Sequence, residues 1–336
     1  EDPVLGFFVR WIEEFSKHAD QVEVICLKEG KHALPENVHV HSLGKSYSAK
    51  ATKGTGARLR YVWRFLSLVW RLRRDYDTVF VHMNQEYILV ASPLWKLFGK
   101  RVYLWRNHYA GSWLTDLATS FCTKVFCTSK YSYTARYEKT VLMPVGIDTE
   151  RFKPDERVAR IPHSILSLGR IAPSKRLEVL IDALAALAHD GIEFTASIIG
   201  SPLPADEAYY AELQERVRAH ALANRVTFLP GVPKSAAPDI YRAHETFVNA
   251  SPSGMLDKTI FEAAACGSIV LARSKDFAAQ AGERFAFETP EELAHALRGR
   301  FSEGRAAFNE DRETLRMLSA KHSLNALAER IATVLY

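Results

Sequence analysis

Two basic side chains and one carboxylate in the second half of the sequence have the types and spacing to bind a nucleotide. Arg170 and Lys175 flank a short loop with no carboxylate between them, and Glu262 lies one turn inside a predicted helix. A pair of cations suits a diphosphate, and a carboxylate can accept hydrogen bonds from the two adjacent hydroxyls of a ribose. The alternative is that Arg170 and Lys175 are ordinary solvated loop charges.

Residues 247–271 predict the elements that would hold Glu262. They indicate a strand at 247–248, a loop of small residues at 250–254, a helix from about 258 to 266 and a strand at 268–271. Asp257 is placed to cap the helix, and the first backbone N–H groups of a helix have no internal partners. We therefore expect an anion to bind where the loop meets the helix.

The whole chain predicts two α/β domains. Its 336 residues are many for one core and suit two domains of roughly 150 residues each. In the first half, strand-like runs separated by helical patterns lie at 22–27, 38–41, 78–82, 101–105, 124–128 and 141–145. Further runs at 165–168, 195–199, 226–229 and 247–249 predict a second doubly wound domain. Because a parallel strand should precede the opening helical pattern, we expect a first strand upstream of residue 1.

Composition indicates an ordinary globular protein with an anionic ligand. The chain is 47% hydrophobic and 25% charged, and its net charge of +5 fits an anionic substrate without requiring nucleic acid. The four cysteines form no C-x-x-C pair, which predicts reduced thiols and a cytoplasmic protein. No apolar run approaches the roughly 18 residues of a membrane-spanning helix, and no signal peptide is visible.

His108 is the residue of the first half best placed for function. It follows the predicted strand 101–105, and open parallel sheets bind ligands beyond the carboxyl ends of their strands. A structural role for this lone histidine is equally open. Asp75 and Asp77 have the D-x-D spacing of some metal sites, but they precede a strand and indicate a turn instead. We therefore expect no metal site.

A basic amphipathic helix is predicted at residues 57–74. Arginines line its polar face, and Trp63 and Trp70 border its apolar face. This pattern is typical of a helix lying on anionic lipid. It is equally typical of a helix packed on a sheet with a solvated basic face, so both interpretations stay open.

Four segments resemble the retaining glycosyltransferases of family 4, also called glycosyl transferases group 1. They are Gly6 in the opening loop, MPVGIDTERFKP at 143–154, LGRIAPSK at 168–175 and the unit at 247–271. The resemblance implies the α/β fold named GT-B, with two Rossmann-like doubly wound domains facing across a cleft. It implies an acceptor-side domain at 1–155, a donor domain at 156–318 and a C-terminal helix at 319–336 that packs back on the first domain. The absence of G-x-G-x-x-G argues against a dehydrogenase.

The resemblance also implies roles for individual residues. Arg170 and Lys175 would hold the diphosphate of the donor and act in catalysis, with His108 beside the transferred sugar. Glu262 would bind the ribose, and Gly6 would let the opening loop approach donor and acceptor. The residues expected to bind the donor are Gly6, Gly169, Ser253, Gly254, Asp257, Lys258, Thr259, Ile260 and Glu262, with backbone amides of 258–260 meeting the phosphates.

One departure from the family concerns the donor sugar. Relatives carry a glutamate eight residues before the one matching Glu262, and this carboxylate contacts the donor sugar; Gly254 stands there in this chain. We hypothesise that Asp257 or Lys258 partly substitutes for it.

The implied function is retaining transfer of a sugar from a UDP-sugar or GDP-sugar to a hydroxyl of a glycan or a lipid-linked acceptor. No cofactor, metal or nucleic acid is expected to take part. Residues 57–74 are expected to contact a membrane surface if the protein is peripheral to the inner face of the membrane. Two alternatives stay open: a nucleotide-sugar epimerase or hydrolase on the same fold, and a non-catalytic nucleotide-binding protein.

Overall fold

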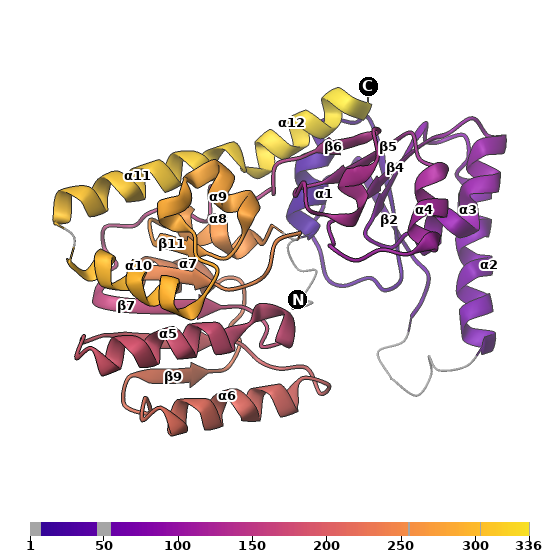
Figure 1. Ribbon diagram of the computed structural model, residues 1–336. Coiled ribbons are helices and arrows are strands. Elements are labelled where there is room, and N and C mark those ends of the chain that lie inside the picture. Colours follow the sequence, from indigo (N-terminus) through magenta and orange to yellow (C-terminus); the bar gives the residue numbers. More distant parts are fainter. Residues whose placement is uncertain (1–7, 46–54, 255, 303, 336) are drawn as a thin grey trace. The chain divides into compact units, whose positions relative to one another are not determined.

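The computed structural model describes residues 8–45, 55–254, 256–302 and 304–335, and these form two compact units (Figure 1). The described parts of Glu1–Met143 and Leu327–Tyr336 make up the first unit, and Pro144–Ala326 makes up the second. The sequence suggested a boundary after residue 155, whereas the second unit begins at Pro144. The reason is that Val145, Ile147 and Phe152 are buried in a core cluster of the second unit.

The described strands of the first unit are all parallel. β1 (Val22–Cys26) pairs with β2 (Val38–Ser42). A second sheet has the order β3 (Thr78–His82), β4 (Arg101–Trp105), β5 (Lys124–Cys127) and β6 (Thr140–Leu142). Each run predicted as a strand contains or overlaps one of these, which confirms the parallel α/β prediction. The strand expected upstream of residue 1 lies outside the described residues.

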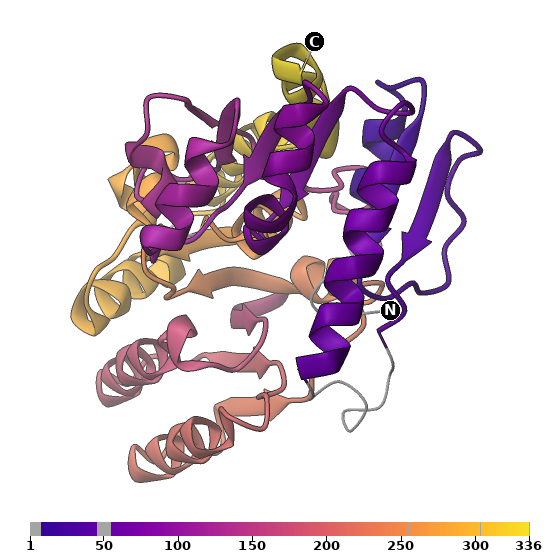
Figure 2. The same ribbon diagram turned by 90° about the vertical axis from the view of Figure 1, so that its right-hand side faces the viewer.

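The helices of the first unit are α1 (Phe8–Ser16), α2 (Thr55–Arg71), α3 (Glu86–Leu97) and α4 (Trp113–Ser120). α2 contacts α3, and α3 contacts α4, so the three form a row (Figures 1 and 2). Phe65 and Val69 of α2 are buried in the core of the unit. Asp77 lies between α2 and β3, in the turn that the sequence predicted. Its carboxylate is 3.9 Å from the Lys100 ammonium.

The second unit is a five-stranded parallel sheet with helices on both faces. The strands are β7 (Ile161–Leu168), β8 (Thr195–Ile199), β9 (Val226–Leu229), β10 (His244–Asn249) and β11 (Ile269–Ala272). Their spatial order is β11-β10-β7-β8-β9, so the chain winds outward from β7 in one direction and then returns to β10 on the other side. Ile165 and Leu166 of β7 enter different core clusters, one on each face of the sheet.

Two layers of helices cover this sheet. One core cluster joins it to α5 (Leu177–His189), α6 (Glu207–Ala219) and α10 (Pro290–Ser302). The other joins it to α7 (Ala237–Ala243), α8 (Lys258–Ala265), α9 (Lys275–Ala281) and α11 (Arg305–Lys321). Among the described helices, none has both the length and the apolar character needed to cross a bilayer.

The C-terminal helix α12 (Leu324–Leu335) starts in the second unit and ends in the first. The Tyr103 hydroxyl lies 3.5 Å from the carbonyl of Val334, and Arg330 donates to the carbonyl of Leu142 at 3.2 Å. The end of the chain therefore packs with the strands of the N-terminal part.

His322, between α11 and α12, clamps the segment that begins the second unit. Its carbonyl accepts the amides of Gly146 and Ile147, both at 3.0 Å. Its Nδ1 accepts the amide of Val145 at 3.2 Å, so the proton lies on Nε2, which is 2.8 Å from Gln280 Oε1 and donates to it. The ring therefore has to be neutral to make these bonds. Burial, and then the charge of Lys321, lower the pKa of His322 from 6.5 to about 4.

We predict that this histidine makes the protein less stable in acid. Its pKa is depressed in the folded state, so its contribution is fully present above the unfolded pKa and is lost as the pH falls from about 6.5 towards 4, by up to about 3 kcal/mol. Urea unfolding at neutral pH and at mildly acidic pH measures this loss. The variant His322→Asn retains an acceptor but cannot titrate, and its unfolding free energy should fall less over the same interval. Parallel curves for the two proteins would contradict the assignment.

Candidate functional site

The candidate site lies where the strand order of the second unit reverses. β7 and β10 are neighbours in the sheet, with Leu166 opposite Phe247, but their connections leave in opposite directions. Open α/β sheets bind ligands beyond the carboxyl ends of two such strands. Gly169 and Arg170 follow β7 at this edge, and the small-residue loop predicted at 250–254 follows β10.

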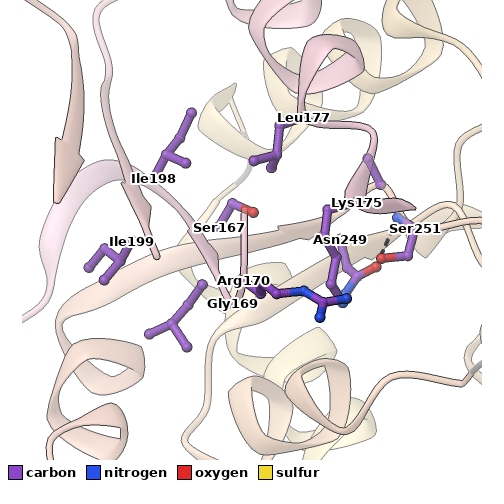
Figure 3. A pocket seen from close by; sticks show the side chains of 11 residues that line it. Ser167, Gly169, Arg170, Lys175, Leu177, Ile198, Ile199, Asn249 and Ser251 are labelled. Atoms are coloured by element: carbon purple, nitrogen blue, oxygen red, sulfur yellow. Dashed lines mark hydrogen bonds between the residues drawn. The ribbon is translucent and has the colours of Figure 1, made fainter. Parts of the chain in front are cut away.

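Side chains from both loops surround a small cavity (Figure 3). It measures about 10 Å³, which is the space of about one water molecule. A pyrophosphate is far larger, so the side chains at the rim have to move apart for one to enter. The lining residues are Ser167, Leu168, Gly169, Arg170, Lys175, Leu177, Ile198, Ile199, Asn249, Ala250 and Ser251.

The two predicted cations share this cavity but differ in their partners. Arg170 is exposed and has no hydrogen bond or ion pair with any residue that the structure describes. Lys175, at the end of a short 3₁₀ turn (Pro173–Lys175), forms an ion pair with the carboxylate of Asp257. The sequence predicted both cations at one site and missed this pair.

Asp257 connects helix α8 to the loop at 169–175, which carries Arg170 and Lys175 and which we call the basic loop. Its Oδ1 accepts the amide of Thr259 at 3.2 Å, which confirms the predicted cap, and its other oxygen binds Lys175. Burial by itself would raise the pKa of this carboxyl, but the charge and hydrogen bond of Lys175 outweigh that effect, and the pKa lies below its ordinary value. Asp257 is therefore an anion at neutral pH.

Asn249 and Ser251 are site residues that the sequence analysis did not single out. The Asn249 amide donates to Asp257 Oδ2 and to Thr259 Oγ1, both at 3.2 Å, and its oxygen accepts the Ser251 amide at 3.0 Å. The Ser251 hydroxyl is buried at the cavity and has no hydrogen-bond partner among the described residues. Buried hydroxyls are rarely left unpaired, which makes this one a candidate ligand contact. Its only sequence signal was its place in the small-residue loop.

Two backbone amides at the amino end of α8 already have hydrogen-bond partners within the protein. The amide of Thr259 donates to the Asp257 side chain, and that of Ile260 lies 3.3 Å from the Asp257 carbonyl. The sequence had assigned both amides, with that of Lys258, to the phosphates. Asp257 occupies these N–H groups because its carboxylate lies within reach of the Thr259 amide and its carbonyl within reach of the Ile260 amide.

Lys258 and Glu262 do not line the cavity. The Lys258 ammonium donates to the carbonyl of Gly146 at 3.0 Å, and burial, followed by the charge of Lys234, lowers its pKa well below the ordinary value. Glu262 is buried, with one carboxylate oxygen 3.4 Å from the Lys234 ammonium. The structure therefore groups Arg170 and Lys175 on one cavity, whereas the predicted ribose ligand Glu262 is absent from its lining and pairs with Lys234.

Of the remaining residues that the sequence predicted for the site, those that the structure describes do not line this cavity. Ser253 accepts the amide of Lys275 at 2.9 Å and so holds the start of α9. Gly254 has φ +103°, which explains its identity, because a glutamate would be strained in that conformation. His108 follows β4 in the first unit, where its Nδ1 lies 2.9 Å from the amide of Ala110. Gly6 lies outside the described residues.

Gly200 lets two loops of the site approach each other. It follows β8, and a Cβ at this position would lie 1.9 Å from the carbonyl oxygen of Gly169. No side chain fits at that separation, so only glycine brings the loop after β8 against the loop that carries Arg170. At Gly231, by contrast, a Cβ would come no nearer than 3.3 Å, to the Ser201 hydroxyl oxygen.

We predict that Gly200→Ala lowers the free energy of unfolding by about 2 kcal/mol or more, because the backbone of Gly169 has to shift. The matched change Gly231→Ala should cost less than about 1 kcal/mol, because a hydroxyl can rotate away. Urea titrations of the two variants give this comparison. Equal stabilities would show that the two loops are not in close contact.

Residues 162–302, all within the second unit, match the family model described as Glycosyl transferases group 1. This region of the chain is therefore similar to the group 1 glycosyltransferases. The matched region contains Arg170, Lys175, Asp257 and Glu262, and it supports the resemblance to glycosyl transferases group 1.

Curated relatives of this domain include two transferases with different products. A D-inositol 3-phosphate glycosyltransferase of Geodermatophilus obscurus is 28% identical over 152 residues, 42% of this chain and 34% of that protein. The mannosylfructose-phosphate synthase of Agrobacterium fabrum is 31% identical over 139 residues, 38% of this chain and 31% of that protein. The chain thus matches these curated relatives over about a third of their length.

Solved structures resemble the chain along its whole length. HepE of Anabaena in complex with UDP has a TM-score of 0.79 at 19% identity, covering 100% of this chain and 97% of that one. Sucrose-phosphate synthase from Thermosynechococcus elongatus has a TM-score of 0.79 at 16% identity, covering 98% and 91%. The fold is therefore GT-B, with two Rossmann-like domains, as the sequence predicted.

Proposed function

We propose that this protein is a retaining glycosyltransferase that moves a sugar from a nucleoside diphosphate sugar to a hydroxyl of a glycan or lipid-linked acceptor. The observation that carries the proposal is the placement of Arg170 and Lys175 on one cavity, at the strand-order reversal of the region that is similar to the group 1 glycosyltransferases. The Anabaena relative HepE is seen with UDP and with UDP-glucose, which supports a nucleoside diphosphate as the ligand.

In the proposed reaction, negative charge develops on the leaving diphosphate as the sugar is transferred. The bond from C1 of the sugar to the diphosphate oxygen breaks, the acceptor oxygen forms its bond to C1 on the same face, and the proton of the acceptor hydroxyl passes to the leaving phosphate oxygen. The leaving phosphate gains negative charge while the sugar becomes oxocarbenium-like. Arg170 and Lys175 would stabilise that charge, and a preorganised contact of this kind is worth about 3 kcal/mol in a transition state.

The two cations differ in how they would reach the phosphate. Arg170 has no described partner and can turn to the ligand directly, whereas Lys175 has to leave Asp257 or bind the phosphate while still paired. The unpaired Ser251 hydroxyl would donate to a phosphate or sugar oxygen. Glu262 would exchange Lys234 for the ribose hydroxyls.

Retention and metal independence belong to the same proposal. The cavity has no carboxylate in its lining, and Asp257 beside it is held by Lys175, so the described cavity offers no ready covalent nucleophile. One guanidinium and one ammonium group, those of Arg170 and Lys175, can supply the positive charge that Mg²⁺ supplies in other transferases. Activity should therefore persist in a chelator such as EDTA.

A second candidate is a protein that binds the nucleotide without transferring a sugar. Gly254 replaces the family's sugar-binding glutamate, and Lys175 is already neutralised by Asp257. Binding of a nucleoside diphosphate without turnover of any donor would favour this candidate. An epimerase or hydrolase would instead consume the donor when the acceptor is omitted.

The donor is identified first by thermal shift with UDP, GDP, ADP and their sugars, because a bound ligand stabilises in proportion to ln(1 + [L]/Kd). With the best donor, Arg170→Ala combined with Lys175→Ala should lower kcat/KM by roughly a hundredfold or more. Arg176→Gln is the matched control, since it removes a neighbouring exposed cation paired with Glu178. Wild-type turnover in the double variant would refute the assignment.

A further inference from the structure

Three adjacent helices of the first unit have an apolar outer surface. α2, α3 and α4 lie in a row (Figures 1 and 2). Each buries one side in the unit and exposes large apolar side chains on the other. We call this surface the outer helical face; its most exposed apolar residues are Leu59, Trp63, Trp70, Leu97, Trp113, Leu117 and Phe121.

α3 is apolar over most of its circumference, although Glu86 lies on the same side as Leu97. Ile88, Ala91 and Trp95 point into the core, yet the opposite side carries Pro93 and Leu97, of which Leu97 is 72% exposed. Its only charged residues are Glu86 in the first turn and Lys96 in the last. A helix that is apolar over most of its circumference is normally covered over most of it. The outer side of α3 therefore indicates a surface that something covers.

α2 adds aromatic residues and positive charge. Leu59 and Trp63 are 64% and 70% exposed, on a side of the helix distinct from the buried Phe65. Arg60 and Arg71 are exposed on the neighbouring side, and α2 contains no acidic residue. The sequence placed Trp63 and Trp70 on one border of the apolar face, and both are exposed in the structure. They form an exposed apolar stripe of their own beside the arginines.

α4 extends the surface on the far side of α3. Trp113 is 70% exposed, and Leu117 and Phe121 each 41%. Between α3 and α4 lies an open groove of about 240 Å³ whose lining includes Lys96 and Lys100. Lys96 is exposed, whereas Lys100 is nearly buried and donates to the carbonyl of Tyr76, so the groove adds one exposed cation to those of α2. By comparison, α6 in the second unit covers its outer side with glutamate and arginine, as solvated helices do.

We propose that the outer helical face docks on the surface of an anionic lipid bilayer. Leucine and tryptophan side chains suit the boundary between headgroups and acyl chains, and arginine and lysine suit the negative headgroups. A second copy of this chain fits less well, since a two-fold interface through α2 would bring its arginines against their own counterparts. The inference does not depend on the proposed transfer reaction, because membrane binding can be measured without donor or acceptor.

Flotation with lipid vesicles tests the proposal. The protein should float with vesicles of phosphatidylcholine mixed with phosphatidylglycerol, should bind vesicles of phosphatidylcholine alone more weakly, and should dissociate as salt is raised. Arg60→Gln combined with Arg71→Gln should weaken binding to the mixed vesicles about fivefold for each arginine. Leu59→Gln combined with Trp63→Gln should weaken it at least about tenfold.

Matched controls come from exposed residues of the second unit. Leu203→Gln with Met317→Gln removes two exposed apolar side chains, and Arg218→Gln with Arg316→Gln removes two exposed cations; both should leave vesicle binding unchanged. Unchanged melting temperatures confirm that each variant is folded. Equal binding to both vesicle types, or no binding, overturns the proposal. A dimer in lipid-free solution that Leu59→Gln with Trp63→Gln dissolves overturns it in favour of a second copy.

Discussion

The ion pair between Lys175 and Asp257 is the interaction on which the candidate site depends. It joins the loop after β7 to the start of α8, and these two segments are far apart in sequence. The same carboxylate caps α8 and accepts a hydrogen bond from Asn249, so one buried anion fixes a helix end, a basic loop and a strand end. A phosphate that binds here competes for Lys175 with Asp257. The site can therefore be rigid and still respond to its ligand.

The fold makes this pairing available through the reversal of strand order. β7 and β10 are adjacent in the sheet, while β8 and β9 extend from the other edge of β7. Their carboxyl ends bring Arg170 and the small-residue loop to one place without a long connection across the sheet. Gly200 completes the arrangement, because its missing side chain lets the next loop touch the carbonyl of Gly169. The positions of Arg170, of the helix cap Asp257 and of Gly200 therefore all follow from the strand order of this sheet.

Local features of this unit could be predicted from the sequence, and contacts between distant segments could not. The helix expected from about 258 to 266 is Lys258–Ala265, and Asp257 caps it, because apolar spacing and capping are properties of neighbouring residues. Lys175 and Asp257 lie 82 residues apart, and no local pattern reports their pairing. The same holds for Glu262 and Lys234, and for the burial of Phe152 in the second unit. The exposure of Trp63 could not be predicted for another reason. Helical spacing shows which side of a helix carries apolar residues but does not show whether another part of the protein covers that side.

The decisive position in the molecule is the point where a diphosphate would meet the basic loop. The most direct measurement is a crystal structure of the protein with the nucleoside diphosphate that stabilises it most. The account predicts that Arg170, Lys175 and the Ser251 hydroxyl contact the phosphate oxygens and that the cavity beside β7 and β10 has opened to admit them. A diphosphate bound elsewhere on the second unit, with Lys175 still paired to Asp257 and Arg170 turned to solvent, would contradict it.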